Sequence, residues 1–156
     1  MSQDQSMPHD DPQAVINFAI EKEQEAVDFY NGLAGKVRSD SIAEELRKMA
    51  QMEERHKERL QNLDVSSGEM LDPVPVKDLR ISDYMVDREP SPEMSWQDIL
   101  VIAMKREQAA MDLYADMANV VTDPTVKKLF ESLAAEEKTH KFYFEAIYDD
   151  DIFQEN

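Results

Sequence analysis

Apolar residues recur along four stretches of the chain at steps of three and four positions. This spacing places the members of each series on one face of an α-helix, where they can form a core. In two of the series, a glutamate and a histidine three positions apart interrupt the middle of the apolar face. These two series are Ile42, Leu46, Met49, Glu53, His56, Leu60, Leu63 and Val126, Phe130, Leu133, Glu137, His140, Phe144, Ile147.

The other two series carry a single acid at their centre. They are Val15, Ala19, Glu23, Ala26, Tyr30, Leu33, Val37 and Ile99, Ala103, Glu107, Ala110, Tyr114, Met117, Val121. Adding 84 to each number of residues 15–63 gives residues 99–147 without a gap, and every central acid and histidine has an identical counterpart. The chain is therefore an internal repeat of two helical hairpins, each with one lone glutamate and one Glu-x-x-His motif.

This repeat predicts an all-α fold, a four-helix bundle built from two antiparallel hairpins within a single domain of 156 residues. Hairpin 1 covers residues 12–63 and hairpin 2 covers residues 95–147. Residues with N-cap chemistry mark the expected helix starts. They are Asp11 before Pro12, Ser39 with Asp40, Ser95 with Asp98, and Asp123 before Pro124. The expected helix ends lie near Lys36, Leu63, Val121 and Ile147.

Residues 64–94 form the connection between the hairpins and hold four of the seven prolines. That composition excludes a long continuous helix. A crossover along the whole bundle would let the second and third helices run in parallel; alternatively, the connection exchanges hairpins between two chains. Residues 1–10 are expected to be a disordered lead-in. Residues 148–156 are expected to be an acidic tail, too short for a fifth substantial helix.

Composition excludes several classes of function. A net charge of −17 argues against binding nucleic acid through its phosphates. The absence of cysteine leaves neither a disulfide framework nor a thiolate metal site. No apolar run is long enough to span a membrane and no signal-type N-terminus is present, so a cytoplasmic location is expected.

Closing the bundle brings the central polar residues into one layer: Glu23, Glu53, His56, Glu107, Glu137 and His140. Four uncompensated buried carboxylates would cost several kcal/mol each, whereas two divalent cations would cancel their charge. Oxygen and imidazole donors without cysteine suit iron or manganese. The competing interpretation, salt-bridged surface residues, fits a single Glu-x-x-His better than a repeated, centred layer. Tyr30 and Tyr114 are candidates to hydrogen-bond the ligand carboxylates, or are ordinary core tyrosines with other partners.

These motifs resemble the ferritin-like superfamily, and most closely the di-iron domain of rubrerythrins. Glu23 with Tyr30, Glu107 with Tyr114, and the two Glu-x-x-His motifs carry the resemblance, which covers about residues 12–147. It implies a non-haem centre of two iron ions per chain, with manganese as the alternative, that reacts with hydrogen peroxide or dioxygen.

Two departures from rubrerythrins matter. The chain lacks the cysteine-rich rubredoxin-like domain that many rubrerythrins carry, so electrons are expected from an external donor such as a rubredoxin-like protein. Ala110 stands where their third helix offers a further glutamate, which puts ligand switching in doubt. Bacterioferritin also pairs two such motifs, but its haem-binding methionine position is held here by Glu54, so no haem is expected. A storage cage also needs a fifth helix, and a homodimer is expected instead.

The resulting hypothesis is a di-iron carboxylate oxidoreductase that reduces hydrogen peroxide or dioxygen. The alternative is a ferroxidase or iron-handling protein, in which Fe²⁺ is the substrate. A third possibility is a partner-binding bundle in which the metal only holds the fold.

Overall fold

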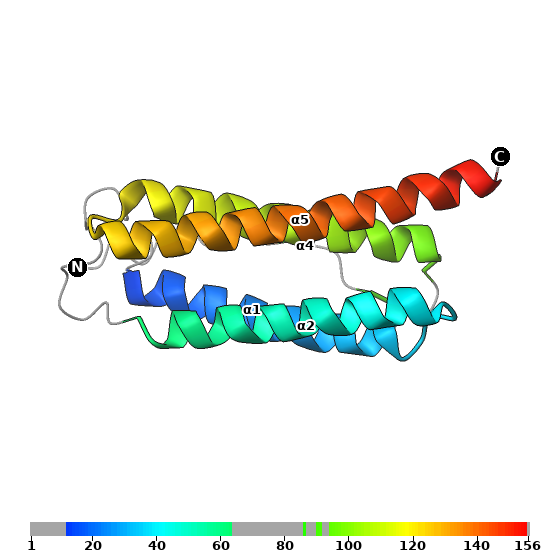
Figure 1. Ribbon diagram of the computed structural model, residues 1–156, viewed down its shortest axis with the longest axis horizontal. Coiled ribbons are helices and arrows are strands. Elements are labelled where there is room, and N and C mark those ends of the chain that lie inside the picture. Colours follow the sequence, from blue (N-terminus) through cyan, green and yellow to red (C-terminus); the bar gives the residue numbers. More distant parts are fainter. Residues whose placement is uncertain (1–11, 64–85, 87–89, 92–93, 156) are drawn as a thin grey trace, which may run out of the picture.

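The computed structural model describes residues 12–63, 86, 90, 91 and 94–155. These residues form four helices, α1 (Pro12–Ala34), α2 (Asp40–Gln61), α4 (Trp96–Val120) and α5 (Pro124–Glu155) (Figure 1). The predicted all-α four-helix bundle is confirmed. None of these helices is long and apolar enough to cross a membrane.

Capping residues start the helices where the sequence predicts. The Ser39 hydroxyl accepts a hydrogen bond from the Ile42 amide at the start of α2. Ser95 and Asp98 form a reciprocal capping box at the start of α4. The Asp123 carboxylate accepts from the amide of Thr125 at the start of α5. The predicted cap Asp11 lies outside the described residues.

The fourth helix is longer than predicted. It does not end near Ile147 but continues to Glu155, through most of the segment predicted to be an acidic tail. Residues 148–155 contain neither proline nor glycine, so nothing in their sequence stops the helix. The prediction failed because it took the end of the apolar series as the end of the helix.

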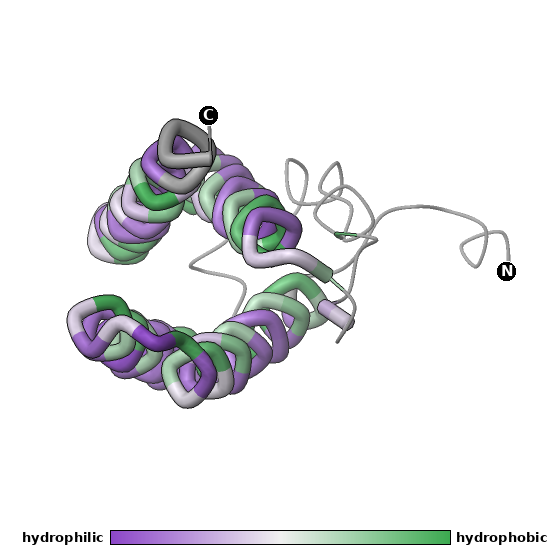
Figure 2. The backbone as a smooth tube through the Cα atoms, turned by 90° about the vertical axis from the view of Figure 1, so that its right-hand side faces the viewer, coloured by the Kyte–Doolittle hydropathy of each residue, from purple (hydrophilic) through white to green (hydrophobic). Residues whose placement is uncertain are grey.

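The helices pack as two hairpins, α1 on α2 and α4 on α5. Viewed along the bundle, the two pairs form two facing layers (Figure 2). α2 ends at the end of the bundle where α5 begins, and α4 begins at the opposite end (Figure 1). Helices α2 and α4 therefore run in the same direction, as a crossover requires. The choice between crossover and exchange falls on residues 64–94, most of which lie outside the described residues.

Two apolar clusters fill the bundle, one toward each end. The first joins the start of α1 and the end of α4 to residues such as Leu60, Phe130 and Leu133. The second joins the end of α1 and the start of α4 to residues such as Leu46 and Phe144. The central polar residues lie between these clusters, so the apolar core positions them from both ends.

Candidate metal centre

The middle layer of the bundle holds buried polar side chains. All are no more than 4% exposed, and they are Glu23, Glu53, His56, Glu107, Glu137 and His140. Each of the four helices contributes at least one of them, because each apolar series is interrupted at the same height. The structure thus brings together the six residues that the sequence singled out.

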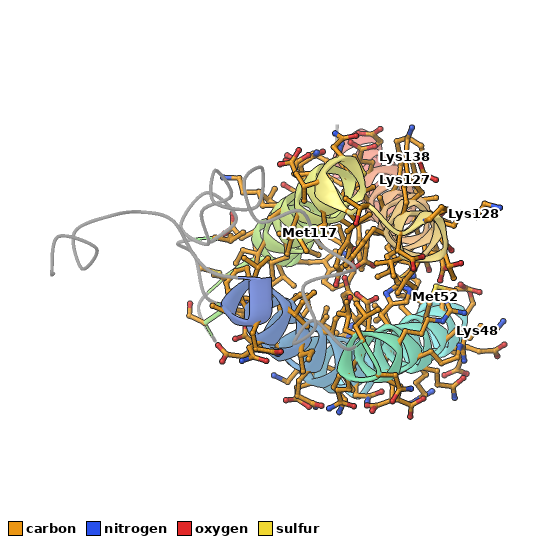
Figure 3. All side chains as sticks on the ribbon, turned by 90° about the vertical axis from the view of Figure 1, so that its left-hand side faces the viewer. Lys48, Met52, Met117, Lys127, Lys128 and Lys138 are labelled. Carbon is orange, nitrogen blue, oxygen red and sulfur yellow. The ribbon has the colours of Figure 1, made fainter. Side chains whose placement is uncertain are left out.

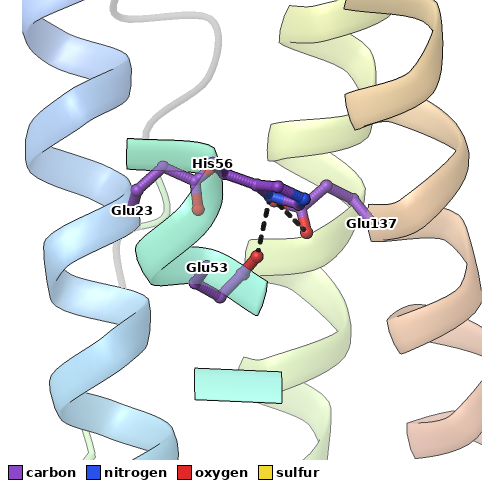
Figure 4. Close-up of side chains that lie close together, drawn as sticks. All are labelled: Glu23, Glu53, His56 and Glu137. Carbon is purple, nitrogen blue, oxygen red and sulfur yellow. Dashed lines mark ion pairs between the residues drawn. The ribbon is translucent and has the colours of Figure 1, made fainter. Parts of the chain in front are cut away.

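The six residues form two overlapping groups. Glu23, Glu53, His56 and Glu137 make up the first, shown in Figure 4. Glu53, Glu107, Glu137 and His140 make up the second, and in each group the candidate donor atoms lie within 4.8 Å of one another. Glu53 and Glu137 belong to both groups, so these two carboxylates could serve either of two ions. Such an arrangement can hold a dinuclear metal centre.

Both imidazoles turn the same ring nitrogen toward the carboxylates. His56 Nδ1 lies 3.0 Å from Glu53 Oε1 and 3.4 Å from Glu23 Oε2. His140 Nδ1 lies 3.4 Å from Glu137 Oε1 and 3.5 Å from Glu107 Oε2. The Nδ1 atoms are thus the candidate metal donors of the two histidines.

Six buried atoms in this layer have no hydrogen-bond partner. They are one Oε1 atom from each of the four glutamates and Nδ1 from each of the two histidines. Leaving buried polar atoms unpaired costs free energy. A pair of divalent cations would satisfy all six, and four carboxylates with two imidazoles suit iron or manganese. The residues present therefore fit a non-haem metal site.

The two predicted tyrosines connect the hairpins. The Tyr30 hydroxyl on α1 donates a hydrogen bond to Glu107 Oε2 on α4. The Tyr114 hydroxyl on α4 donates to Glu23 Oε2 on α1. Each tyrosine therefore orients the lone glutamate of the other hairpin, while Oε1 of that glutamate stays unpartnered.

Sequence reasoning missed one carboxylate, Glu136. Its Oε1 lies 2.8 Å from Nε2 of His56, on the side of the ring away from the buried layer. Glu136 itself accepts a hydrogen bond from the Ser132 hydroxyl at 3.1 Å. A search for repeated residues could not find it, because position 52 in the first half is a methionine. The available signal was that Glu136 lies four positions before His140, about one helical turn away.

Burial and crowding shift the pKa values of the carboxylates and imidazoles in this layer. Burial, with the neighbouring Glu137 charge, raises the pKa of Glu23 to about 7. Burial also raises the pKa of Glu53 and Glu107 well above the usual carboxyl range. Burial alone would lower the pKa of His140, but bonding to Glu107 and Glu137 raises it to about 11. Protons therefore occupy part of the layer at neutral pH when no cation balances the carboxylates.

A cavity of about 60 Å³ opens between α1 and α4 onto this layer. We call it the α1–α4 cavity. Four glutamates of the layer line it, and its walls include the small side chains of Ala26 and Ala110 and the apolar Leu113. At its rim the Arg106 guanidinium lies 5.1 Å from the centre of the Phe29 ring. The space exceeds what a single water needs, so a small neutral molecule can reach the carboxylates.

Comparison with known proteins extends this picture. A model of the rubrerythrin family matches residues 14–148. A structure from Thermotoga maritima, assigned as a ferritin-like diiron-carboxylate protein, is similar with a TM-score of 0.71 and 19% identity over 90% of this chain and 96% of that one. A hypothetical protein from Pyrococcus furiosus has a TM-score of 0.62 and 23% identity over 86% of each chain. Among curated proteins, none matches the sequence.

Metal loading of the layer should release protons. The pKa of His56 is raised to about 9 and that of His140 to about 11, so both are protonated at neutral pH. Ligation needs neutral imidazoles, so apparent affinity for Mn²⁺ should rise between about pH 6 and about pH 8. Calorimetric titration in two buffers of different ionisation enthalpy measures the released protons. Affinity that is independent of pH, with no proton release, would contradict this assignment.

Proposed function

The chain belongs to the rubrerythrin family, and we propose that it is a non-haem di-iron oxidoreductase that reduces hydrogen peroxide or dioxygen. The observation that carries the proposal is the convergence of six buried, unpartnered donor atoms between two apolar clusters. Some of these atoms lie at ion-pair distance from one another, as His56 Nδ1 does from Glu53 Oε1 at 3.0 Å. None of the six is hydrogen-bonded, and all face a common centre, as metal ligands do.

We assign the ligands by group. Glu23 and His56 would hold one iron ion, and Glu107 and His140 would hold the other. Glu53 and Glu137 belong to both groups and would help to hold either ion. Manganese is the alternative metal, since it accepts the same donors.

Two iron ions bound here would supply the two electrons that convert hydrogen peroxide and two protons into two water molecules. The protein contributes geometry and access. Tyr30 and Tyr114 fix the lone glutamates through their hydroxyls. The α1–α4 cavity admits a small neutral reactant, while its carboxylate floor repels anions.

An external donor would return the electrons, and a rubredoxin-like protein is our proposal for it. Homodimer assembly and a cytoplasmic location also stay predictions from the sequence. The internal repeat, at an offset of 84 residues, supplies both halves of the site within one chain. The proposed chemistry therefore does not need a second subunit.

The second candidate is iron handling, with Fe²⁺ as the substrate. One observation favours it: the two histidines differ in their support. Glu136 backs His56, whereas its repeat counterpart is Met52. An ion held by the histidine without such a carboxylate would be released more easily, as a site through which iron passes requires.

Metal stoichiometry tests the ligand assignment. Anaerobic loading with Fe²⁺ should give about two ions per chain. Replacing His56 or His140 by alanine should weaken at least one site by about 10-fold, as loss of ligand-shell groups does. His9→Ala, outside the repeat, is the matched control and should bind like the native protein. Elemental analysis that finds one ion or none at saturation would refute the assignment.

Reactivity separates the two candidate functions. Anaerobic, iron-loaded protein should be oxidised by about one hydrogen peroxide per pair of ions, because each peroxide takes two electrons. A reductant should reverse the absorbance change, and the iron should stay with the protein through a desalting step. Continued Fe²⁺ consumption well beyond two ions per chain, with ferric product off the site, would instead establish iron handling.

The α1–α4 cavity offers a further test of entry. Ala110→Leu should fill much of the cavity and lower kcat/KM for peroxide on the order of 10-fold, with unchanged metal content. The bulkier tert-butyl hydroperoxide should be affected more than hydrogen peroxide. Ala115→Leu, exposed on the same helix, is the matched control. Unchanged kinetics of Ala110→Leu with both peroxides would show that entry lies elsewhere.

A further inference from the structure

The support of the two candidate metal-binding histidines is unequal. On the His56 side, Nδ1 faces the carboxylate layer and Nε2 lies 2.8 Å from Glu136 Oε1. Glu136 comes from α5 and His56 from α2, so this contact joins the two hairpins. The imidazole is therefore held from both sides, by the layer and by Glu136.

Glu136 is itself held in place. The Ser132 hydroxyl donates to its Oε2 at 3.1 Å, and the Arg59 guanidinium lies 3.9 Å from the same atom. Its side chain is 30% exposed, whereas that of His56 is 1% exposed. The carboxylate thus lies at the edge of the bundle, keeps a negative charge beside Arg59, and reaches inward to a buried ring.

The internal repeat does not reproduce this support on the other side. At an offset of 84, Glu136 is aligned with Met52, Ser132 with Lys48, and Arg59 with Tyr143. Met52 lies on α2 at the margin facing α5 (Figure 3). A thioether is only a weak hydrogen-bond acceptor, so Met52 cannot do for an imidazole what Glu136 does. Among the residues that the structure describes, the six candidate ligands are repeated, whereas the carboxylate behind His56 has no counterpart at the aligned position.

We propose that Glu136 is a positioning residue that makes the His56 side the tighter of two unequal metal positions. The first ion to bind occupies the Glu23–His56 side, and the ion on the Glu107–His140 side exchanges more readily. The inference rests on the proposed metal centre but not on peroxide reduction, since affinity is measured without turnover.

The physical reason is the effect of a carboxylate behind a ligand histidine. Such a carboxylate fixes the ring orientation and the tautomer and increases the donor strength of the other nitrogen. Removing a partner of this kind typically costs 10- to 100-fold in metal affinity. The Nε2–Glu136 contact leaves Nδ1 as the metal donor, and Nδ1 is the atom found unpartnered in the layer.

The test is a stepwise titration of the metal-free full chain with Co²⁺, followed by calorimetry and by the visible absorption of the bound ion. The native protein should show two steps of different affinity. Glu136→Leu should weaken the tighter step by about 10-fold or more and change the weaker step little. Glu136→Gln keeps a neutral acceptor, so the affinity of its tighter step should lie between those of the native protein and Glu136→Leu. This graded effect separates positioning from general damage to the fold.

The repeat supplies reciprocal variants. Met52→Glu introduces a carboxylate at the aligned position and should strengthen the weaker step. His56→Ala should weaken mainly the tighter step and His140→Ala mainly the weaker one, each by about 10-fold or more, which assigns each step to its side. Two equal steps in the native protein, or an equal loss of both steps in Glu136→Leu and Glu136→Gln, would overturn the proposal. Unequal steps in a protein that does not turn over peroxide would refute the proposed enzyme activity and leave this inference standing.

Discussion

The structure depends on four carboxylates enclosed at the centre of an apolar bundle. Four buried carboxylates with two imidazoles place more negative than positive charge in the interior of the bundle. Burial of these carboxylates and their mutual repulsion raise the pKa values of Glu23, Glu53 and Glu107. Bound protons neutralise part of this negative charge, and two divalent cations would neutralise all of it. Every other feature of the middle layer, from the tyrosine hydroxyls to Glu136, orients groups around that charge.

Much of this layer was predictable because the same pattern occurs twice in the chain. One apolar helical series with polar residues at its centre is a weak signal, whereas the same interruption 84 residues later indicates which acids and histidines come together. The sequence could not show that Glu53 and Glu137 would belong to both groups, because sharing depends on how deeply each helix sits in the bundle. Glu136 was not predicted because the aligned position in the first half is not a glutamate. The extension of α5 to Glu155 was not predicted because a helix can continue beyond the last residue of its apolar face.

The repeat and its departures carry different kinds of information. Residues that are identical in both halves, such as Tyr30 with Tyr114, form reciprocal contacts that connect the hairpins. Residues that differ, such as Met52 and Glu136, set the two sides of the site apart. The proposed metal centre would then have repeated ligands but unequal surroundings, so one ion would be held more tightly than the other.

The pairing of α1 with α2 and of α4 with α5 also has a consequence for how the chain reaches its folded state. Contacts within each hairpin close short stretches of chain, and such local contacts form quickly. Joining the hairpins is different, because it brings Glu23 and Glu53 up to Glu107 and Glu137 and must overcome their mutual repulsion. We therefore expect the carboxylate charges to oppose the joining of the two hairpins, and divalent cations to favour it.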